Sequence, residues 1–430
     1  MAVDQAALSN ERRQREAAVV SPRRRRPGEL VVAALGAALA AAAATVVVVA
    51  DTVTDPEGLA LLLVANVLGF VLAGLMWRRS RPGSPFGPLL VAFGFLLGFA
   101  CLAGASQPLL FDLGVLLDAP TVLFAWWLIL SFPSGRLDRV GRALMLVGSG
   151  VVLLGFVPKI LVTPSIRGAT PLAECTLPCP ANRLLVADEP GLADFFRGVE
   201  AYGRFTVVAL ILATLAMRFL RASRPRRRVL SPVYLVWVIW LLAFGAYGLA
   251  VQVLHASVDF THPLGLALTG SRVLLPFAFV AAIVLARAYA GAALESMVRD
   301  LTGRTSAARL ERIVRKVLDD SSAQLAFWLP RANVFADRHG RALGAAPADS
   351  GTSERVFGRA DGTPVVAIVH DAALDEDHEL VEAVGAASML ALENERLQQD
   401  LRRAVEDLQA SRKRLVTIGA VERRKIERDL

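Results

Sequence analysis

Eight stretches of about 20 mainly apolar residues follow one another between residues 30 and 290, and they constrain the fold more than any other feature. A helix of about this length is needed to cross the hydrocarbon core of a bilayer. We therefore predict eight membrane-spanning helices, of which the fourth is the weakest because Asp118 and Pro120 interrupt it. The predicted spans are Leu30–Ala50, Leu59–Trp77, Phe86–Ala105, Leu113–Phe132, Ala143–Val162, Tyr202–Leu220, Val229–Leu254 and Arg272–Ala290.

Arginine is distributed unevenly between these spans, and its distribution predicts the orientation of the chain. Sixteen arginines lie before the first span or in alternate connections, whereas the other connections carry mainly acidic residues. Because arginine-rich connections stay in the cytoplasm, an even number of spans places both termini there. The net charge of +8 is then explained by orientation, and no nucleic acid is expected as a partner. The sixteen residues are Arg23–Arg26, Arg78, Arg79, Arg81, Arg136, Arg139, Arg142, Arg218, Arg221, Arg224, Arg226, Arg227 and Arg228.

The domain organisation in the membrane half follows from the same pattern. Residues 1–29 are expected to form a disordered basic cytoplasmic tail, and 30–290 a membrane domain with one long outer connection, 163–201. That connection holds Cys175 and Cys179. A disulfide between them is permitted outside the membrane and would close a very small ring. The alternative is two unpaired thiols.

Asp118 is the candidate sensing residue of the membrane domain. A carboxylate inside a span is costly, which suggests a functional role or a charged partner. The alternative is that Asp118 lies near the outer interface and is in contact with water. His255, Asp259 and His262 share the last outer connection, but their spacing matches no established metal site, so no metal is expected.

The part of the chain after the last span has the charge pattern of a soluble protein. Residues 291–303 are expected to form a linker helix, and 304–390 a small α+β domain. Asp361-Gly362 predicts a hairpin turn before a nearly continuous apolar strand that is expected to be central. The predicted strands are Leu325–Leu329, Val356–Arg359 and Val365–His370.

Apolar residues follow a heptad pattern over 387–418, which predicts a parallel two-stranded coiled coil and therefore a homodimer. Asn394 would fix its register. The alternative is a single amphipathic helix that packs on its own domain. The pattern breaks at Gly419, a change of phase that is typical of a switch. The predicted seam is Ala387, Leu390, Asn394, Leu397, Leu401, Ala404, Leu408, Ser411, Leu415 and Ile418, and the switch region includes Gly419, Glu422, Ile426 and Leu430.

The segment Glu422-Arg-Arg-Lys-Ile-Glu-Arg-Asp-Leu430 resembles the start of the dimerisation and phosphoacceptor domain of NarL/DesK-type bacterial sensor histidine kinases. In that family a segment of the form E-R-x-x-I-x-R-[DE]-L leads into H-D-x-x-Q, whose histidine accepts phosphate from ATP. The chain ends at Leu430, immediately before that position. Other segments resemble the actinobacterial branch of the family in order and spacing. They are Arg78–Gly87, Phe132–Leu137, Leu325–Pro330, Val365–Asp371 and Leu392–Leu397.

This resemblance implies a sensor of the bacterial plasma membrane that relays a stimulus to a kinase core. Residues 304–390 would be a GAF-like domain, and 419–430 the start of the phosphoacceptor helix. ATP, Mg²⁺ and the cognate response regulator would bind the kinase core, so no cofactor or catalytic residue is expected in this chain. His339, His370 and His378 are expected at the surface or in turns. The chain is expected to be a fragment or a truncated product, and whether it is an enzyme stays open.

Two other functions remain open. One is a membrane transporter or channel with a regulatory tail. Few polar residues are expected inside the membrane beyond Asp118, which argues against it. The other is a non-catalytic receptor that dimerises with an intact kinase and dampens it.

Overall fold

The structure is a computed structural model that describes residues 27–429, except for 51, 52, 54, 82, 165–180, 223, 255, 301–306, 319, 331, 343–351, 360, 372, 373 and 375–377. The chain divides into two compact units, which are described separately. The first consists of Met1–Leu220 and Ser231–Ala281, and the second of Arg221–Leu230 and Ala282–Leu430. Cys175 and Cys179 lie outside the described residues.

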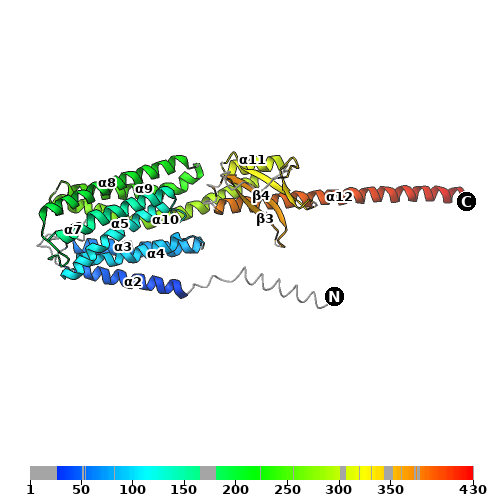
Figure 1. The fold of residues 1–430 in the computed structure, drawn as a ribbon. Coiled ribbons are helices and arrows are strands. Elements are labelled where there is room, and N and C mark those ends of the chain that lie inside the picture. Colours follow the sequence, from blue (N-terminus) through cyan, green and yellow to red (C-terminus); the bar gives the residue numbers. More distant parts are fainter. Residues whose placement is uncertain are drawn as a thin grey trace. The chain divides into compact units, whose positions relative to one another are not determined.

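Eight helices in the described part of the chain are long and apolar enough to cross a membrane, as the sequence predicts. These helices form a bundle with roughly parallel axes, and α3 packs against both α2 and α4 (Figure 1). The third span combines α4 with a 3₁₀ turn, η1, and the fifth combines α6, a π-helical turn, η2, and α7. The helices are α2 (Pro27–Val48), α3 (Pro56–Ser80), α4 (Phe86–Phe99), η1 (Ala100–Gly104), α5 (Pro108–Ser131), α6 (Arg139–Val151), η2 (Val152–Phe156), α7 (Val157–Val162), α8 (Pro190–Arg221), α9 (Arg224–Gln252) and α10 (Val258–Asp300).

Seven of the eight spans belong to helices that begin earlier than their apolar stretches predict, and only α4 begins at the predicted residue. Helix α5 begins at Pro108, and α8 begins at Pro190, so the last part of the predicted connection 163–201 is helical. Helix α10 begins at Val258, which places Asp259 and His262 on a helix and not in a connecting loop. Proline is favourable at the start of α5 and α8, since its missing N–H would have no partner there. The first turns of α8 and α10 contain Asp194 and Asp259, which lower the apolar character of these segments.

Aromatic side chains form the packing centre at one end of the first unit. The Trp77 and Phe86 rings lie 5.0 Å apart, and both contact Phe279 of α10. Phe132, at the end of α5, completes the group with a ring 5.4 Å from that of Phe86. These contacts connect α3, α4, α5 and α10 through side chains that are almost fully buried.

The second unit contains a small antiparallel sheet with strand order β2-β1-β4-β3. Strand β4 is central, as predicted, and the Asp361-Gly362 turn joins it to β3, with Gly362 at a φ of 84° that glycine adopts without strain. His370 lies on β4 and is 0% exposed, so the expectation of a surface position for this residue is wrong. The strands are β1 (Gln324–Leu329), β2 (Val334–Ala336), β3 (Thr352–Gly358) and β4 (Pro364–Asp371).

Helices α11 (Ala307–Leu318) and α12 (His378–Asp429) pack on the sheet, and residues of α10, α11 and α12 share one hydrophobic core with it. Helix α11 contributes Leu310 and Val314, and the first turns of α12 contribute Val381 and Val384. Met297 comes from the end of α10 and is 0% exposed in the same core. Helix α10 (Val258–Asp300) therefore contributes residues to both units, and Met297 is its contribution to the core of the second.

Helix α12 extends well beyond the sheet domain, and its leucine stripe is uncovered in the single chain. Leu397, Leu401, Leu408 and Leu415 are each about two-thirds exposed. Ala387, at the start of the predicted seam, is buried in the domain core. The alternative in which one helix buries this stripe on its own domain therefore does not describe residues 390–415 of the structure.

Candidate functional site

The candidate site is a group of charged side chains inside the apolar bundle, and Asp118 is its centre. Asp118 lies ten residues after the start of α5, about 15 Å along the helix axis. Its side chain is buried, with 6% of the residue exposed. Four charged residues from other helices, Lys159, Glu200, Arg204 and Arg272, lie within electrostatic range of its carboxylate. The structure therefore places Asp118 in the interior of the bundle, with charged neighbours.

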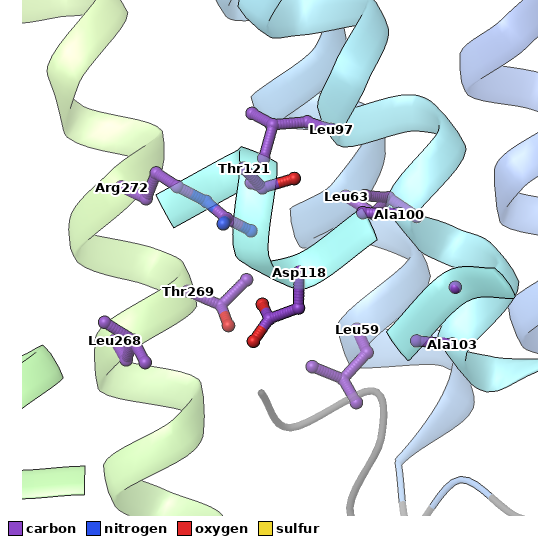
Figure 2. Close-up of a pocket in the computed structure, with 11 residues that line it drawn as sticks. Leu59, Leu63, Leu97, Ala100, Ala103, Asp118, Thr121, Leu268, Thr269 and Arg272 are labelled. Carbon is purple, nitrogen blue, oxygen red and sulfur yellow. The ribbon is translucent and has the colours of Figure 1, made fainter. Parts of the chain in front are cut away.

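Arg272 approaches Asp118 from α10. Figure 2 shows Asp118, Thr269 and Arg272 converging from the two facing helices. The Arg272 Nε donates a hydrogen bond of 3.2 Å to Oδ1 of Asn66 on α3. Asn66 is fully buried, and its Nδ2 donates to the carbonyl oxygens of Leu62, at 2.8 Å, and Thr269, at 3.4 Å. The neutral side chain of Asn66 thus holds the Arg272 guanidinium between α3 and α10. Because Asn66 has no charge, this contact does not compensate the positive charge of Arg272.

A second set of charges joins α7 to α8. Glu200 is 1% exposed and accepts hydrogen bonds from both Lys159 and Arg204, one on each carboxylate oxygen. The Arg204 guanidinium lies 5.3 Å from the centre of the Phe244 ring, and the Lys159 ammonium lies 5.2 Å from that of Phe156. Because a buried charge is costly unless it is paired, one carboxylate between two cations, each near an aromatic face, is a stabilised arrangement.

Local backbone structure brings Lys159 to Glu200. The π-helical turn η2 inserts a wider turn in the fifth span, where the Val157 N–H donates to the Val152 carbonyl oxygen. Gly155 in this turn packs against α8 so closely that a Cβ would lie 2.9 Å from the backbone nitrogen and Cα of Glu200. The close approach of the two backbones allows the Lys159 side chain to reach the Glu200 carboxylate. Such π-turns are frequent at functional sites.

The charges of the site do not balance. Lys159, Arg204 and Arg272 are positive, and Asp118 and Glu200 are negative, so the fully ionised group has a net charge of +1. Among the described residues, Asp118 has no ion pair within 4.0 Å, and its Oδ2 has no hydrogen-bond partner. Arg204 Nη1 and Trp126 Nε1 are also buried without a partner in this part of the structure. Trp240 Nε1, which lines a cavity shared with Asp118, is a third such donor. Among the described residues, the site therefore has one buried acceptor atom and three buried donor atoms without a hydrogen-bond partner.

Three small cavities meet at Asp118. One of about 40 Å³ extends between apolar side chains of α3, α4 and η1 and the polar residues Thr121, Thr269 and Arg272 (Figure 2). Another, of about 10 Å³, lies on the side of Trp126 and Arg204. The third, of about 20 Å³, lies beside Trp240 and Arg272. A small-molecule site usually has several hundred Å³, so these cavities have room for water and not for a substrate of ordinary size.

The described residues contain no group of three or more His, Cys, Asp or Glu side chains that could hold a metal ion. Asp118 and its four charged neighbours form a buried charge network. Such a network can bind protons, hold water or respond to the electric field across a membrane.

Of the sequence-predicted site residues, the structure brings Asp118 together with partners that the sequence analysis did not name. The expectation of few other polar residues within the membrane is wrong, because Lys159, Glu200, Arg204 and Asn66 are buried in the bundle and Arg272 is partly buried there. The signal was present for Lys159 and Arg204, each a charged residue inside a predicted apolar span. Glu200 could not be found this way, because it precedes the apolar stretch of its helix.

The predicted seam and switch lie on one unbroken helix, α12. Leu390 and Asn394 are exposed together with the leucines that follow them. The helix continues through Ile418, Gly419, Glu422 and Ile426, whose side chains are not described, and Leu430 lies outside the described residues.

Comparisons of the chain with family models, with curated proteins and with solved structures found no match. The fold and the site define a general class of protein. The chain is a polytopic helical membrane protein with a small sheet domain and a buried charge cluster.

Proposed function

We propose that this chain is the membrane sensor and signal-transmission region of a two-component sensor histidine kinase of the NarL/DesK type. It acts in the bacterial plasma membrane with both termini in the cytoplasm. The charge cluster around Asp118 is the input site, the sheet domain is a GAF-like relay, and α12 leads to a kinase core. That core binds ATP and Mg²⁺ and phosphorylates a response regulator. The resemblance of residues 422–430 to the start of a phosphoacceptor domain supports this assignment.

The observation that carries the proposal is the continuity of α10. This helix contributes Arg272 to the charge cluster and Met297 to the core of the sheet domain. A helix is stiff along its axis, so a rotation or shift of α10 at Arg272 also moves Met297. Because protein cores are close-packed, the domain must respond as a unit to such a movement. A stimulus needs to favour one arrangement of the cluster by only a few kcal/mol to shift the balance between two states.

The exposed stripe of α12 supports the output half of the proposal. We assign its occupant as the same stripe on a second copy of the chain, in a parallel coiled coil. The heptad spacing, the exposure of the leucines and the single Asn394 in the seam all fit this partner. Burying one leucine side chain contributes about 1.5–3 kcal/mol, which makes an uncovered stripe of this length unfavourable in water. Gly419, Glu422, Ile426 and Leu430 then form the region where a change in helix packing reaches the phosphoacceptor.

Cysteine cross-linking of the full chain tests the dimer. Cys101, Cys175 and Cys179 are first replaced by serine, and Leu401→Cys is compared with Glu406→Cys on the opposite side of the helix. Mild oxidation in membrane vesicles should link the Leu401→Cys chain into a dimer and leave the Glu406→Cys chain monomeric. Equal cross-linking of both variants, or of neither, contradicts the parallel coiled coil.

A fusion tests the kinase assignment. Residues 1–430 are joined in frame to the phosphoacceptor and ATP-binding domains of a NarL/DesK-type kinase, and autophosphorylation with ATP and Mg²⁺ is measured in vesicles. The fusion should be active, and Asn394→Leu should stabilise the dimer and reduce the response to stimulus. Gln399→Leu, outside the seam, is the matched control. A fusion that stays inactive in the wild-type form, or an Asn394→Leu chain that signals normally, counts against the proposal.

A second candidate, a transporter or channel, is favoured by the buried charges, which are common along ion and proton pathways. The small cavities argue against transport of a molecular substrate. A flux assay for protons and small ions in vesicles separates the two functions, because a sensor produces no net flux. A non-catalytic receptor is distinguished by its effect on an intact kinase, whose autophosphorylation it would reduce when co-expressed.

A further inference from the structure

The volume of the three cavities around Asp118 limits what they can contain. A water molecule needs a cavity of about 10–15 Å³. The cavity beside Thr269 and Arg272, at about 40 Å³, has room for two or three waters, and the one beside Trp126 and Arg204, at about 10 Å³, for one. A wholly apolar cavity of this size would stay empty. The walls here are mainly apolar, but Asp118 lines all three cavities, together with Arg204 or Arg272, and these charged groups can bind water.

The buried polar atoms without a hydrogen-bond partner are the groups that would bind such water. Asp118 Oδ2, Arg204 Nη1 and Trp126 Nε1 all belong to residues that line the smallest cavity, and none has a hydrogen-bond partner in the described part of the chain. Trp240 Nε1, in the cavity shared with Arg272, is a further buried donor without a partner there. Leaving such groups unsatisfied costs about 1–3 kcal/mol each, so water that bridges them is favourable.

Asp118 is the one ionisable acceptor that all three cavities reach. The charged groups that face it are Lys159 on α7, Glu200 and Arg204 on α8, and Arg272 on α10. The residues that α3, α4, η1 and α9 contribute to the cavity walls are uncharged. Glu200 already pairs with two cations, whereas the Asp118 carboxylate has no ion pair within 4.0 Å among the residues that the structure describes.

We propose that Asp118 and the water around it form a proton-binding site within the membrane. A hydronium ion that reaches the cavities transfers its proton to a carboxylate oxygen of Asp118, which leaves a neutral carboxyl and a water molecule. The reverse step returns the proton to water. Protonation removes the negative charge that faces Arg204 and Arg272, so the attraction between α5 and the helices α8 and α10 weakens.

If the chain is a sensor, the proton concentration is its stimulus, and this part of the inference rests on the proposed function. The proton-binding site itself does not depend on that function. In a sensor, the weakened attraction would be felt along α10, which carries both Arg272 and Met297. The proton site is therefore tested on the purified chain, which needs no kinase core for the measurement.

Difference infrared spectroscopy of the full chain in lipid nanodiscs tests the site. Titration with acid over the pH range in which the chain stays folded should raise the carbonyl band of a protonated carboxyl, with the isotope shift expected in heavy water. Because the chain has 39 Asp and Glu residues, Asp118→Asn should remove one component of this band and not the whole band. Asp112→Asn, a matched change six residues earlier on α5 and outside the three cavities, should keep that component.

Two further variants keep the test decisive if Asp118→Asn does not fold. Asp118→Glu should retain a titrating carboxyl band at an altered midpoint. Trp126→Phe, which removes a donor from the cavity that Trp126 and Asp118 both line, should also move the midpoint. A titrating band that is the same in all these variants, or the absence of any titrating carboxyl band in the wild type, overturns the proposal. An inactive kinase fusion would count against the sensor function alone.

Discussion

Gly385 on α12 lies directly against the ring of Phe357 on β3, so closely that a Cβ at this position would overlap the ring atoms. Phe357 is part of the domain core, together with Val381 and Val384 from the same helix. The missing side chain of Gly385 therefore allows the first turns of α12 to pack onto the sheet. This contact positions the start of the helix that carries the leucine stripe.

We expect Gly385→Ala to destabilise the sheet domain by about 1–3 kcal/mol, because an added methyl group in a close-packed contact forces a side chain or a helix to move. Hydrogen exchange of the β3 and β4 amides in the full chain measures the effect. Gly291→Ala on α10 is the control, since a Cβ there meets nothing within 4 Å, and alanine favours the helix by up to about 1 kcal/mol. Equal exchange in the Gly385→Ala chain and the wild type would show that α12 does not depend on this contact.

The close approach of Gly155 to the backbone of Glu200 gives a second prediction. Gly155→Ala should separate α7 from α8 and weaken the Lys159–Glu200 pair, with a loss of about 1–3 kcal/mol in stability. Gly150→Ala in the same span is the control, because a Cβ at that position has open space. Thermal unfolding in detergent measures both variants. The prediction is wrong if the two variants unfold at the same temperature.

The ion pairs among Lys159, Glu200 and Arg204 predict which substitution destabilises the protein more. Glu200→Gln leaves two buried cations without their carboxylate and should cost about 3–5 kcal/mol. Lys159→Met should cost less, because Arg204 still pairs with Glu200. The unfolding midpoints of both variants in detergent give the comparison. A larger loss for Lys159→Met than for Glu200→Gln would show that Glu200 is stabilised mainly by the lysine.

The apolar spans were predictable because a span needs only composition and length, both of which are local properties of the chain. The charged and polar partners of residues inside the membrane could not be predicted. Lys159 and Glu200 are separated by 41 positions, and Asn66 and Arg272 by 206. A charged residue inside a span indicates that a partner exists, but the helix packing that selects the partner depends on contacts such as that of Gly155, which no spacing rule reveals.

Asp320 gives a pH-dependent prediction outside the membrane. Burial raises the pKa of its carboxyl, but hydrogen bonds from the Ser322 hydroxyl and from the backbone N–H groups of Asp371 and Ser322 outweigh this effect and lower the pKa below its ordinary value. A carboxyl whose pKa is lowered by folding stabilises the protein fully above the pKa of the unfolded chain, about 3.9 for aspartate. That stability is lost as the pH falls through the folded value.

We therefore expect Asp320→Asn to loosen the end of β4, where the Asp371 N–H donates to Asp320 at 3.0 Å. The difference in hydrogen exchange from the wild type, corrected for the intrinsic rate, should be full at about pH 7 and decrease below about pH 4. Glu354→Gln on β3 removes a neighbouring charge without these hydrogen bonds and serves as the control. A difference that stays constant with pH would assign the effect to packing.

The soluble half shows a similar limit on what sequence can predict. The central strand and the Asp361-Gly362 turn follow from apolar runs and turn chemistry, both of which are local. Strand β2 was missed because it has only three residues. The burial of His370 was missed because a polar residue at the end of an apolar strand is ordinarily assigned to the surface. The heptad of α12 was readable, but only the structure shows that its leucines are uncovered in one chain.

The π-helical turn Val152–Phe156 carries one residue more than an α-helical turn would need between the same two segments. If the same residues were wound as an ordinary α-helix, everything beyond them would be rotated by about 100°. Lys159 would then point away from Glu200 while every side chain in the span stayed chemically the same. The wider winding of this short turn therefore matters as much as the identity of the charges.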